Sequence, residues 1–240
     1  MIAKCVWPLV AGVSLMGAAI AEEADARWVE LAATDAAAWY GKTGSGRVTN
    51  VDGKKGNGYA YVYQLEDKKK HTYSYGQVVV LLESCPKGYG YVYYNDTQGQ
   101  YVNKGQFVRF GDTVVDALGS AACASWDSET GKRSRVEAEG TWKVVATAKG
   151  TGNRFSLKTD TVRKAPYDGQ QALHVLFAFE DVTADTTDYG EFVVPLADCR
   201  RGYGTVHELD FSGQQVSKSD FVLDGNSVIS AIAANMCAYN

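Results

Sequence analysis

The segment CPKGYGYVYYNDTQGQYV, residues 85–102, decides the fold because it recurs 114 positions later as CRRGYGTVHELDFSGQQV, residues 199–216. At this offset, residues 75–124 align with 189–238 without a gap, and 22 of the 50 positions are identical. A repeated unit of about 100 residues has the size of a domain and is longer than a solenoid repeat. The sequence therefore predicts a tandem duplication of one domain.

The first 21 residues have the pattern of a secretory signal peptide. Lys4 supplies a positive charge, an apolar run covers 6–20, and Ala19-Ile20-Ala21 fits the small residues of a cleavage site. The run is short for a membrane span of about 20 residues, so we expect cleavage rather than an uncleaved anchor. With no transmembrane segment expected after cleavage, the sequence predicts an exported protein, located in the periplasm or on the cell surface.

The composition is that of an ordinary globular protein, with 45% hydrophobic and 22% charged residues. The formal net charge is −4. Proteins that bind nucleic acids normally carry a basic surface, so this charge argues against nucleic acid as a partner.

Four cysteines remain after the predicted signal peptide: Cys85, Cys123, Cys199 and Cys237. An even number in an exported chain indicates two disulfide bonds, and four cysteines allow three pairings. We expect Cys85–Cys123 and Cys199–Cys237, because each repeat then closes its own core. Pairing across the repeats would also be symmetric, but it requires the two domains to interlock.

We expect a first domain over residues 22–124, a linker over 125–140 and a second domain over 141–240. Each domain is predicted to be α+β, with a small antiparallel sheet and a C-terminal helix that one disulfide attaches to the sheet. Asp112-Thr113 and Asn226-Ser227 precede apolar residues at helical spacing and are candidate N-caps.

The core strand is predicted from alternation. Tyr59, Tyr61 and Tyr63 recur at every second position, and the offset places apolar residues at the matching positions of the second repeat. A further strand, 76–85, is expected to end at Cys85.

The tyrosines of the opening segment divide into two groups. Tyr89 recurs as Tyr203 and is expected to be part of the framework, whereas Tyr91 and Tyr93 correspond to Thr205 and His207, which tolerate water. Tyrosine is enriched at protein interfaces. We therefore predict a partner-binding patch on a solvated sheet face, made by Tyr91, Tyr93, Tyr94 and Tyr101. The alternative is cross-strand packing that only stabilises the sheet.

The sequence contains no pattern of a catalytic, cofactor or metal site. The three histidines, His71, His174 and His207, lack the spacing of a zinc site, and His174 is expected to be structural. A nucleophile elbow and a phosphate-binding loop are also absent from the sequence. We therefore predict a protein that is not an enzyme and has no cofactor.

Each repeat resembles the surface-adhesin protein E family of exported bacterial proteins. The shared features are an early tryptophan, a cysteine after a strand and a helix that ends at a second cysteine. Here they are Trp28, Cys85 and 111–123, and again Trp142, Cys199 and 225–237. The chain departs from the family by its duplication and by the Gly-Tyr-Gly that follows the first cysteine of each repeat. The resemblance implies adhesion to host matrix proteins.

We therefore predict a non-catalytic, adhesin-like binding protein that contacts a protein partner through an exposed tyrosine-rich sheet face. The alternative is a periplasmic inhibitor or immunity protein that blocks a toxin or a cell-wall enzyme. A long aromatic loop that enters an active site would favour the inhibitor. The oligomeric state cannot be predicted from these patterns.

Overall fold

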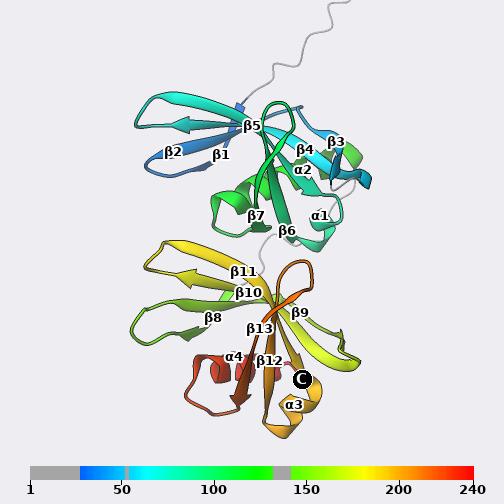
Figure 1. Ribbon diagram of the computed structural model, residues 1–240, viewed down its shortest axis with the longest axis vertical. Coiled ribbons are helices and arrows are strands. Elements are labelled where there is room, and N and C mark those ends of the chain that lie inside the picture. The colour runs from blue at the N-terminus through cyan, green and yellow to red at the C-terminus, as the bar shows by residue number, and fades with distance from the viewer. Residues whose placement is uncertain (1–27, 52–53, 132–141) are drawn as a thin grey trace, which may run out of the picture.

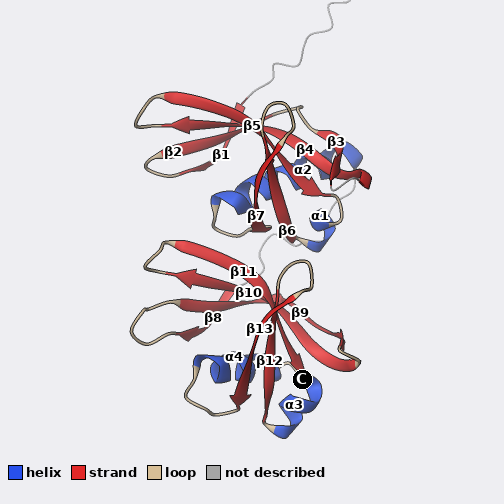
Figure 2. Cartoon of the chain, in the orientation of Figure 1, coloured by secondary structure: helices blue, strands red, loops and turns tan. Residues whose placement is uncertain are grey.

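The computed structural model describes residues 28–51, 54–131 and 142–240 and shows a chain built mainly of β-strands (Figure 1, Figure 2). The predicted signal peptide and most of the predicted linker lie outside these residues. Within them, 56% of the residues lie in strands and 18% in helices, and the strands form two antiparallel sheets. The predicted α+β class was therefore wrong.

Glycine-rich segments explain the difference. Residues 41–46 and 53–58 contain several glycines, which favour turns and are depleted in strands. In the structure, residues from both segments extend strands and add a hairpin to the first sheet. Tertiary pairing thus overrides the local preference, and the helices remain a minor part of a β structure.

The first sheet belongs to the first repeat, by which we mean the described residues up to 131. Its strands are β1 (Trp28–Ala33), β2 (Ala37–Lys42), β3 (Arg47–Val51), β4 (Lys54–Asp67), β5 (Thr72–Leu81), β6 (Tyr89–Asn95) and β7 (Tyr101–Val108). Their order is β1-β2-β4-β5-β6-β7, with β3 paired to β4. The strand β7 is therefore an edge strand.

The second sheet belongs to the second repeat, residues 142–240. Its strands are β8 (Trp142–Thr147), β9 (Arg154–Tyr167), β10 (Gln170–Asp181), β11 (Thr186–Pro195), β12 (Tyr203–Leu209) and β13 (Gln215–Val222), in the order β13-β12-β11-β10-β9-β8. The long strand β9 takes the place of β2 and β3, and its pairing with β10 shifts register between His174 and Leu176.

The duplication is visible in the strand registers. Tyr89 pairs with Val108 between β6 and β7, and Tyr203 pairs with Val222 between β12 and β13. In Figure 1 the sheets lie one above the other along the long axis, and the β4–β5 hairpin (cyan) and the β10–β11 hairpin (yellow) point the same way. The two repeats thus have the same orientation.

One glycine position is required in both repeats. A Cβ atom on Gly76 would lie 2.7 Å from the carbonyl oxygen of Asn95 and 2.8 Å from the ring of Tyr63. Gly190 is similarly close to the ring of Phe177 and to the carbonyl oxygen of Leu209. Because any side chain would collide with both neighbours, glycine lets the aromatic ring lie flat across the strand.

The helices α2 (Val114–Thr130) and α4 (Val228–Cys237) begin at the predicted N-caps. The Thr113 hydroxyl accepts the backbone N–H of Asp116, and Ser227 does the same for Ser230. The core between α2 and the first sheet includes Tyr59, which confirms its predicted packing role. The helix α2 continues to Thr130, beyond Cys123; the boundaries of the predicted domains stay a prediction.

Two short helices carry the first cysteine of each pair. Contrary to expectation, β5 ends at Leu81, and Cys85 lies in α1 (Ser84–Lys87). Cys199 lies in α3 (Leu196–Arg201). Each helix ends at a glycine with positive φ, 82° at Gly88 and 81° at Gly202, a conformation that glycine adopts without a steric penalty.

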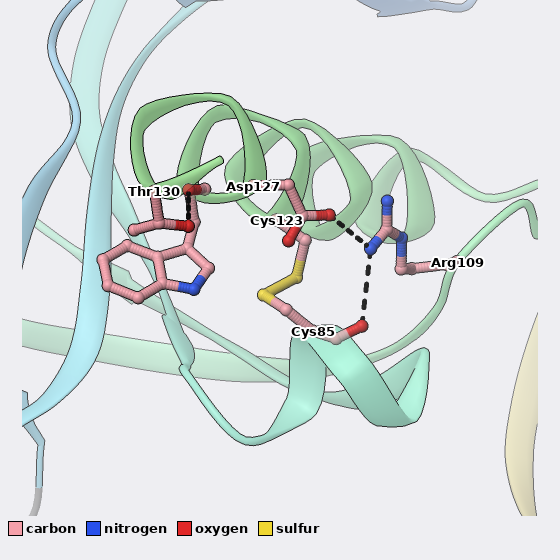
Figure 3. The surroundings of a disulfide bond; sticks show 6 residues. Cys85, Arg109, Cys123, Asp127 and Thr130 are labelled. Atoms are coloured by element: carbon pink, nitrogen blue, oxygen red, sulfur yellow. Dashed lines mark hydrogen bonds and ion pairs between the residues drawn. A yellow bond between two sulfur atoms is a disulfide. The ribbon is translucent and has the colours of Figure 1, made fainter. Parts of the chain in front are cut away.

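Both predicted disulfide bonds are present, Cys85–Cys123 and Cys199–Cys237. Figure 3 shows that the first lies beside the buried Arg109, which donates to the carbonyl oxygen of Cys85 at 3.4 Å and to Asp127 at 3.1 Å. The bond and this ion pair together attach α1 and β7 to α2. Disulfides of this kind are typical of proteins from oxidising compartments.

The described residues include no helix that is both long and apolar enough to cross a membrane.

Replacing Cys85 and Cys123 together by alanine should lower the free energy of unfolding by about 3–4 kcal/mol, because the bond closes a loop that is otherwise free in the unfolded chain. Chemical denaturation measures the change. The Cys199/Cys237 pair has the same sequence separation of 38 residues and serves as a matched comparison. An unchanged denaturation midpoint in both double variants would contradict this stabilising role.

Candidate functional site

The predicted patch tyrosines do not share one face of the sheet. Tyr91 and Tyr93 lie on the side away from α2, as strand alternation requires. Tyr94 lies on the α2 side, where its ring meets Tyr63 edge to face at a centroid distance of 6.2 Å. Burial raises the pKa of Tyr94 to about 12. Tyr94 is therefore separated from the other patch residues by the sheet itself.

Tyr93 and Tyr101 line an open groove of about 370 Å³ on the side of the first sheet away from α2. Their ring centroids are 6.5 Å apart. Tyr101 is 62% exposed, whereas Val51 and Val79, which also line the groove, are buried. The remaining lining residues are Asn50, Asn95, Gly99 and Lys104. This set, called the groove below, combines aromatic rings, amides and one cation.

The groove takes its shape from β3 and the β6–β7 hairpin. Asn50 accepts the backbone N–H of Gly56 and so closes the connection between β3 and β4. Across the groove, the Asp96 carboxylate accepts the N–H groups of Gln98 and Gln100 and fixes the hairpin turn. The groove walls are therefore set by local hydrogen bonds.

Tyr91 lies between the groove and the second repeat. The ammonium group of Lys104 lies 4.2 Å from the centroid of its ring, and the ring of Phe211, in the β12–β13 turn, lies 6.1 Å away. Burial, and then the charge of Asp210, raises the pKa of Tyr91. One predicted patch residue therefore joins the two repeats.

Tyr89 continues this contact. Its ring lies 5.0 Å from that of Phe211, and both pack beside a buried cluster of Val108, Leu176 and Tyr189. Val108 comes from the first repeat, and Leu176 and Tyr189 come from the second. We call this packing the inter-repeat contact. Tyr89 therefore has a packing role, as predicted, but it packs against residues of both repeats and not of the first repeat alone.

Asp116 is the polar centre of the inter-repeat contact and is fully buried. Its carboxylate accepts the N–H of Val108 at 2.7 Å, the N–H and hydroxyl of Thr113 at 2.9 and 2.7 Å, and the hydroxyl of Tyr189 at 2.7 Å. The backbone N–H of Tyr189 donates to the Gln106 amide at 3.1 Å. Burial and the nearby Asp116 carboxylate raise the pKa of Tyr189.

A buried charged group lies on the second sheet beside this contact. His174 Nδ1 is 3.2 Å from Glu191, which also forms an ion pair with Arg163. Burial, and then Glu191, raises the pKa of Tyr89, while Arg163 acts in the opposite direction. His174 thus has a charged partner inside the fold, consistent with the structural role expected for it.

His174 and His207 both lie beside the ring of Tyr167, at centroid distances of 6.3 and 4.9 Å, whereas His71 belongs to the other repeat. His71 is exposed in the turn before β5, and His207 contacts Gln215 at 2.7 Å. Over the described ranges, no group of three or more His, Cys, Asp or Glu side chains is placed to hold a metal ion.

Sequence reasoning missed most of the groove lining and the whole inter-repeat contact. Asn50 lies between the two glycine-rich segments 41–46 and 53–58, where the sequence predicted no strand, and Lys104 recurs as Lys218, so neither residue was distinctive. The available signal was the contrast between Phe211 and its equivalent Thr97, which placed an aromatic residue in a polar turn of one repeat only.

No protein-family model, curated protein or solved structure matches the chain. The function must therefore be argued from the geometry of the site.

Tyr189→Phe should lower the free energy of unfolding by about 1–3 kcal/mol, because it removes a hydrogen bond to a buried carboxylate. Denaturant unfolding measures the loss. Tyr75 is the equivalent residue of the first repeat and is 51% exposed. Tyr75→Phe should change the stability by less than about 0.5 kcal/mol. Equal effects of the two substitutions would show that the bond to Asp116 contributes nothing.

Proposed function

We propose that this chain is an exported, non-catalytic binding protein that receives a protein partner in the groove beside β7. The observation that carries the proposal is the exposed Tyr101 next to the half-buried Tyr93, with amides and a lysine around them. Tyrosine offers a large contact area for little loss of side-chain entropy, and amides supply adaptable hydrogen bonds.

The edge strand β7 supports a peptide as the bound element. Residues 101–104 are exposed and lie at the edge of the sheet. An extended segment of a partner can add to such an edge through its backbone, while neighbouring pockets receive its side chains. Tyr101 and Lys104 belong to β7 and line the groove, so one partner segment can reach both the edge and the groove.

The positive charge of Lys104 favours negatively charged or carbonyl groups on a partner. Burial raises the pKa of Asp210, but hydrogen bonds from Ser212 and Gln214 and the charge of Lys104 outweigh it, so the net shift is downward. Lys104 thus acts on the second repeat as well as on the groove. We expect a partner segment with an acidic or carbonyl-rich face.

The adhesin-like activity implied by the resemblance to the surface-adhesin protein E family is compatible with this groove. The inhibitor alternative predicts a long aromatic loop. The turn at the groove, residues 96–100, is short and contains no aromatic residue. The groove therefore favours binding of a partner segment over insertion of a loop into an enzyme.

Tyr93→Ala combined with Tyr101→Ala should weaken binding to the partner at least about tenfold, which corresponds to about 1.4 kcal/mol. Immobilised host matrix proteins and a periplasmic extract of the source cell are the two partner sources, and surface plasmon resonance measures the affinity. Binding to matrix proteins supports adhesion, whereas a single stoichiometric bacterial partner supports the inhibitor.

Two matched controls separate the groove from general surface effects. Tyr73→Ala removes a tyrosine that is 54% exposed outside the groove, and Lys218→Ala removes the repeat equivalent of Lys104. Both controls should bind as the unmodified protein does, while Lys104→Ala binds more weakly. If the groove variants keep full affinity for every partner found, the groove is not the binding site.

A further inference from the structure

The aromatic pair at the inter-repeat contact occurs twice in the chain. Trp142 and Tyr189 have ring centroids 5.9 Å apart, and their equivalents Trp28 and Tyr75 have centroids 6.0 Å apart. Tyr189 is 6% exposed because the first repeat covers it, whereas Tyr75 is 51% and Trp28 37% exposed. The first repeat thus presents at its outer end the same surface that the second repeat buries. We call Trp28 and Tyr75 the head.

The covering surface also occurs twice. In the inter-repeat contact, Tyr89 and the fully buried Val108 of the first repeat pack on the second. Their equivalents Tyr203 and Val222 have the same identities and pair with each other in the same register. Tyr203 is 56% and Val222 60% exposed. We call Tyr203 and Val222 the tail.

The polar contacts can be repeated as well. Tyr189 uses Gln106 and Asp116 as acceptors, and the equivalents of these residues are Asp220 and Ser230. Both equivalents carry oxygen acceptors. The ladder between β5 and β6 begins at Gln77, and that between β11 and β12 begins at Glu191, so the backbones of Tyr75 and Tyr189 both lie just beyond a ladder. A tail placed on a head therefore meets a donor arrangement like the one inside the molecule.

We propose that the head receives the tail of a second copy of this chain, so that the inter-repeat contact is repeated between molecules. The two repeats have the same orientation along the long axis (Figure 1). A contact of this kind joins different surfaces of the two molecules and leaves a free head and a free tail in every assembly. Repetition gives an open chain of molecules.

This association is weaker than the contact inside the molecule. Between molecules, Thr97 takes the place of Phe211 and Thr205 the place of Tyr91, so the ring contacts that Phe211 makes with Tyr89 and Tyr91 have no equivalent. The internal contact also gains from covalent linkage, which gives it a high effective concentration. We therefore expect assembly to increase with protein concentration.

The test uses variants that remove one surface at a time from the chain starting at residue 22. Tyr75→Asp places a charge in the head and leaves the tail intact. Tyr203→Asp places a charge in the tail and leaves the head intact. Sedimentation velocity should show concentration-dependent oligomers for the unmodified protein and monomers for each variant alone. An equimolar mixture of the two variants should form a dimer and no larger species, because it offers one intact head and one intact tail.

Tyr101→Asp is the control, because Tyr101 is also exposed but belongs to the groove. This variant should assemble as the unmodified protein does, which keeps the inference independent of the proposed function. Circular dichroism and thermal unfolding verify that each variant is folded. The inference is overturned if the unmodified protein stays monomeric up to about 1 mM, if either variant assembles alone, or if the mixture remains monomeric.

Discussion

The structure depends on one buried carboxylate. Asp116 begins α2 through its bonds with Thr113, holds the end of β7 through the Val108 N–H and accepts the hydroxyl of Tyr189. A buried charge is costly unless it is hydrogen-bonded, and four donors meet that requirement here. The donors come from the start of α2, the end of β7 and the second repeat. If any of these three parts moved, the buried carboxylate would lose a hydrogen bond.

The two repeats have diverged where they meet. Tyr91 and Phe211 pack together, and their equivalents are Thr205 and Thr97. The divergence therefore adds an aromatic contact on each side of one interface and leaves polar residues at the two outer ends. Two surfaces that were once identical can therefore form one preferred contact inside the chain and a weaker contact between chains. The preference comes from a difference in affinity and requires no change of fold.

The repeat made several features predictable. It indicated the disulfide pairing, the N-caps Thr113 and Ser227 and the core role of Tyr59, because each depends on residues close in sequence or on the match between repeats. The balance of strand and helix was not predictable. Gly41 and Gly58 lie in strands because they pair with Tyr63 and Thr49 on neighbouring strands, whereas local glycine content indicates turns.

In the candidate site, too, local features were predictable from the sequence and contacts between the repeats were not. Strand alternation puts Tyr91 and Tyr93 on one face and Tyr94 on the other, although the predicted patch included all three. What alternation could not show is that Phe211, more than 100 residues later, covers Tyr91. Contacts between repeats depend on the path of the whole chain, and no short pattern encodes that path.

The placement of the disulfides has a mechanical consequence. When the chain is pulled from its two ends, tension enters the first repeat through β1 to β5 and passes from Cys85 directly to Cys123. The strands β6 and β7 lie inside the bridged loop and outside this covalent path, so they cannot be pulled into an extended chain while the bond is intact. Tyr93 and Tyr101 of the groove and Tyr89 and Val108 of the inter-repeat contact all belong to that loop. These residues of the groove and of the inter-repeat contact therefore lie outside the covalent path that resists stretching.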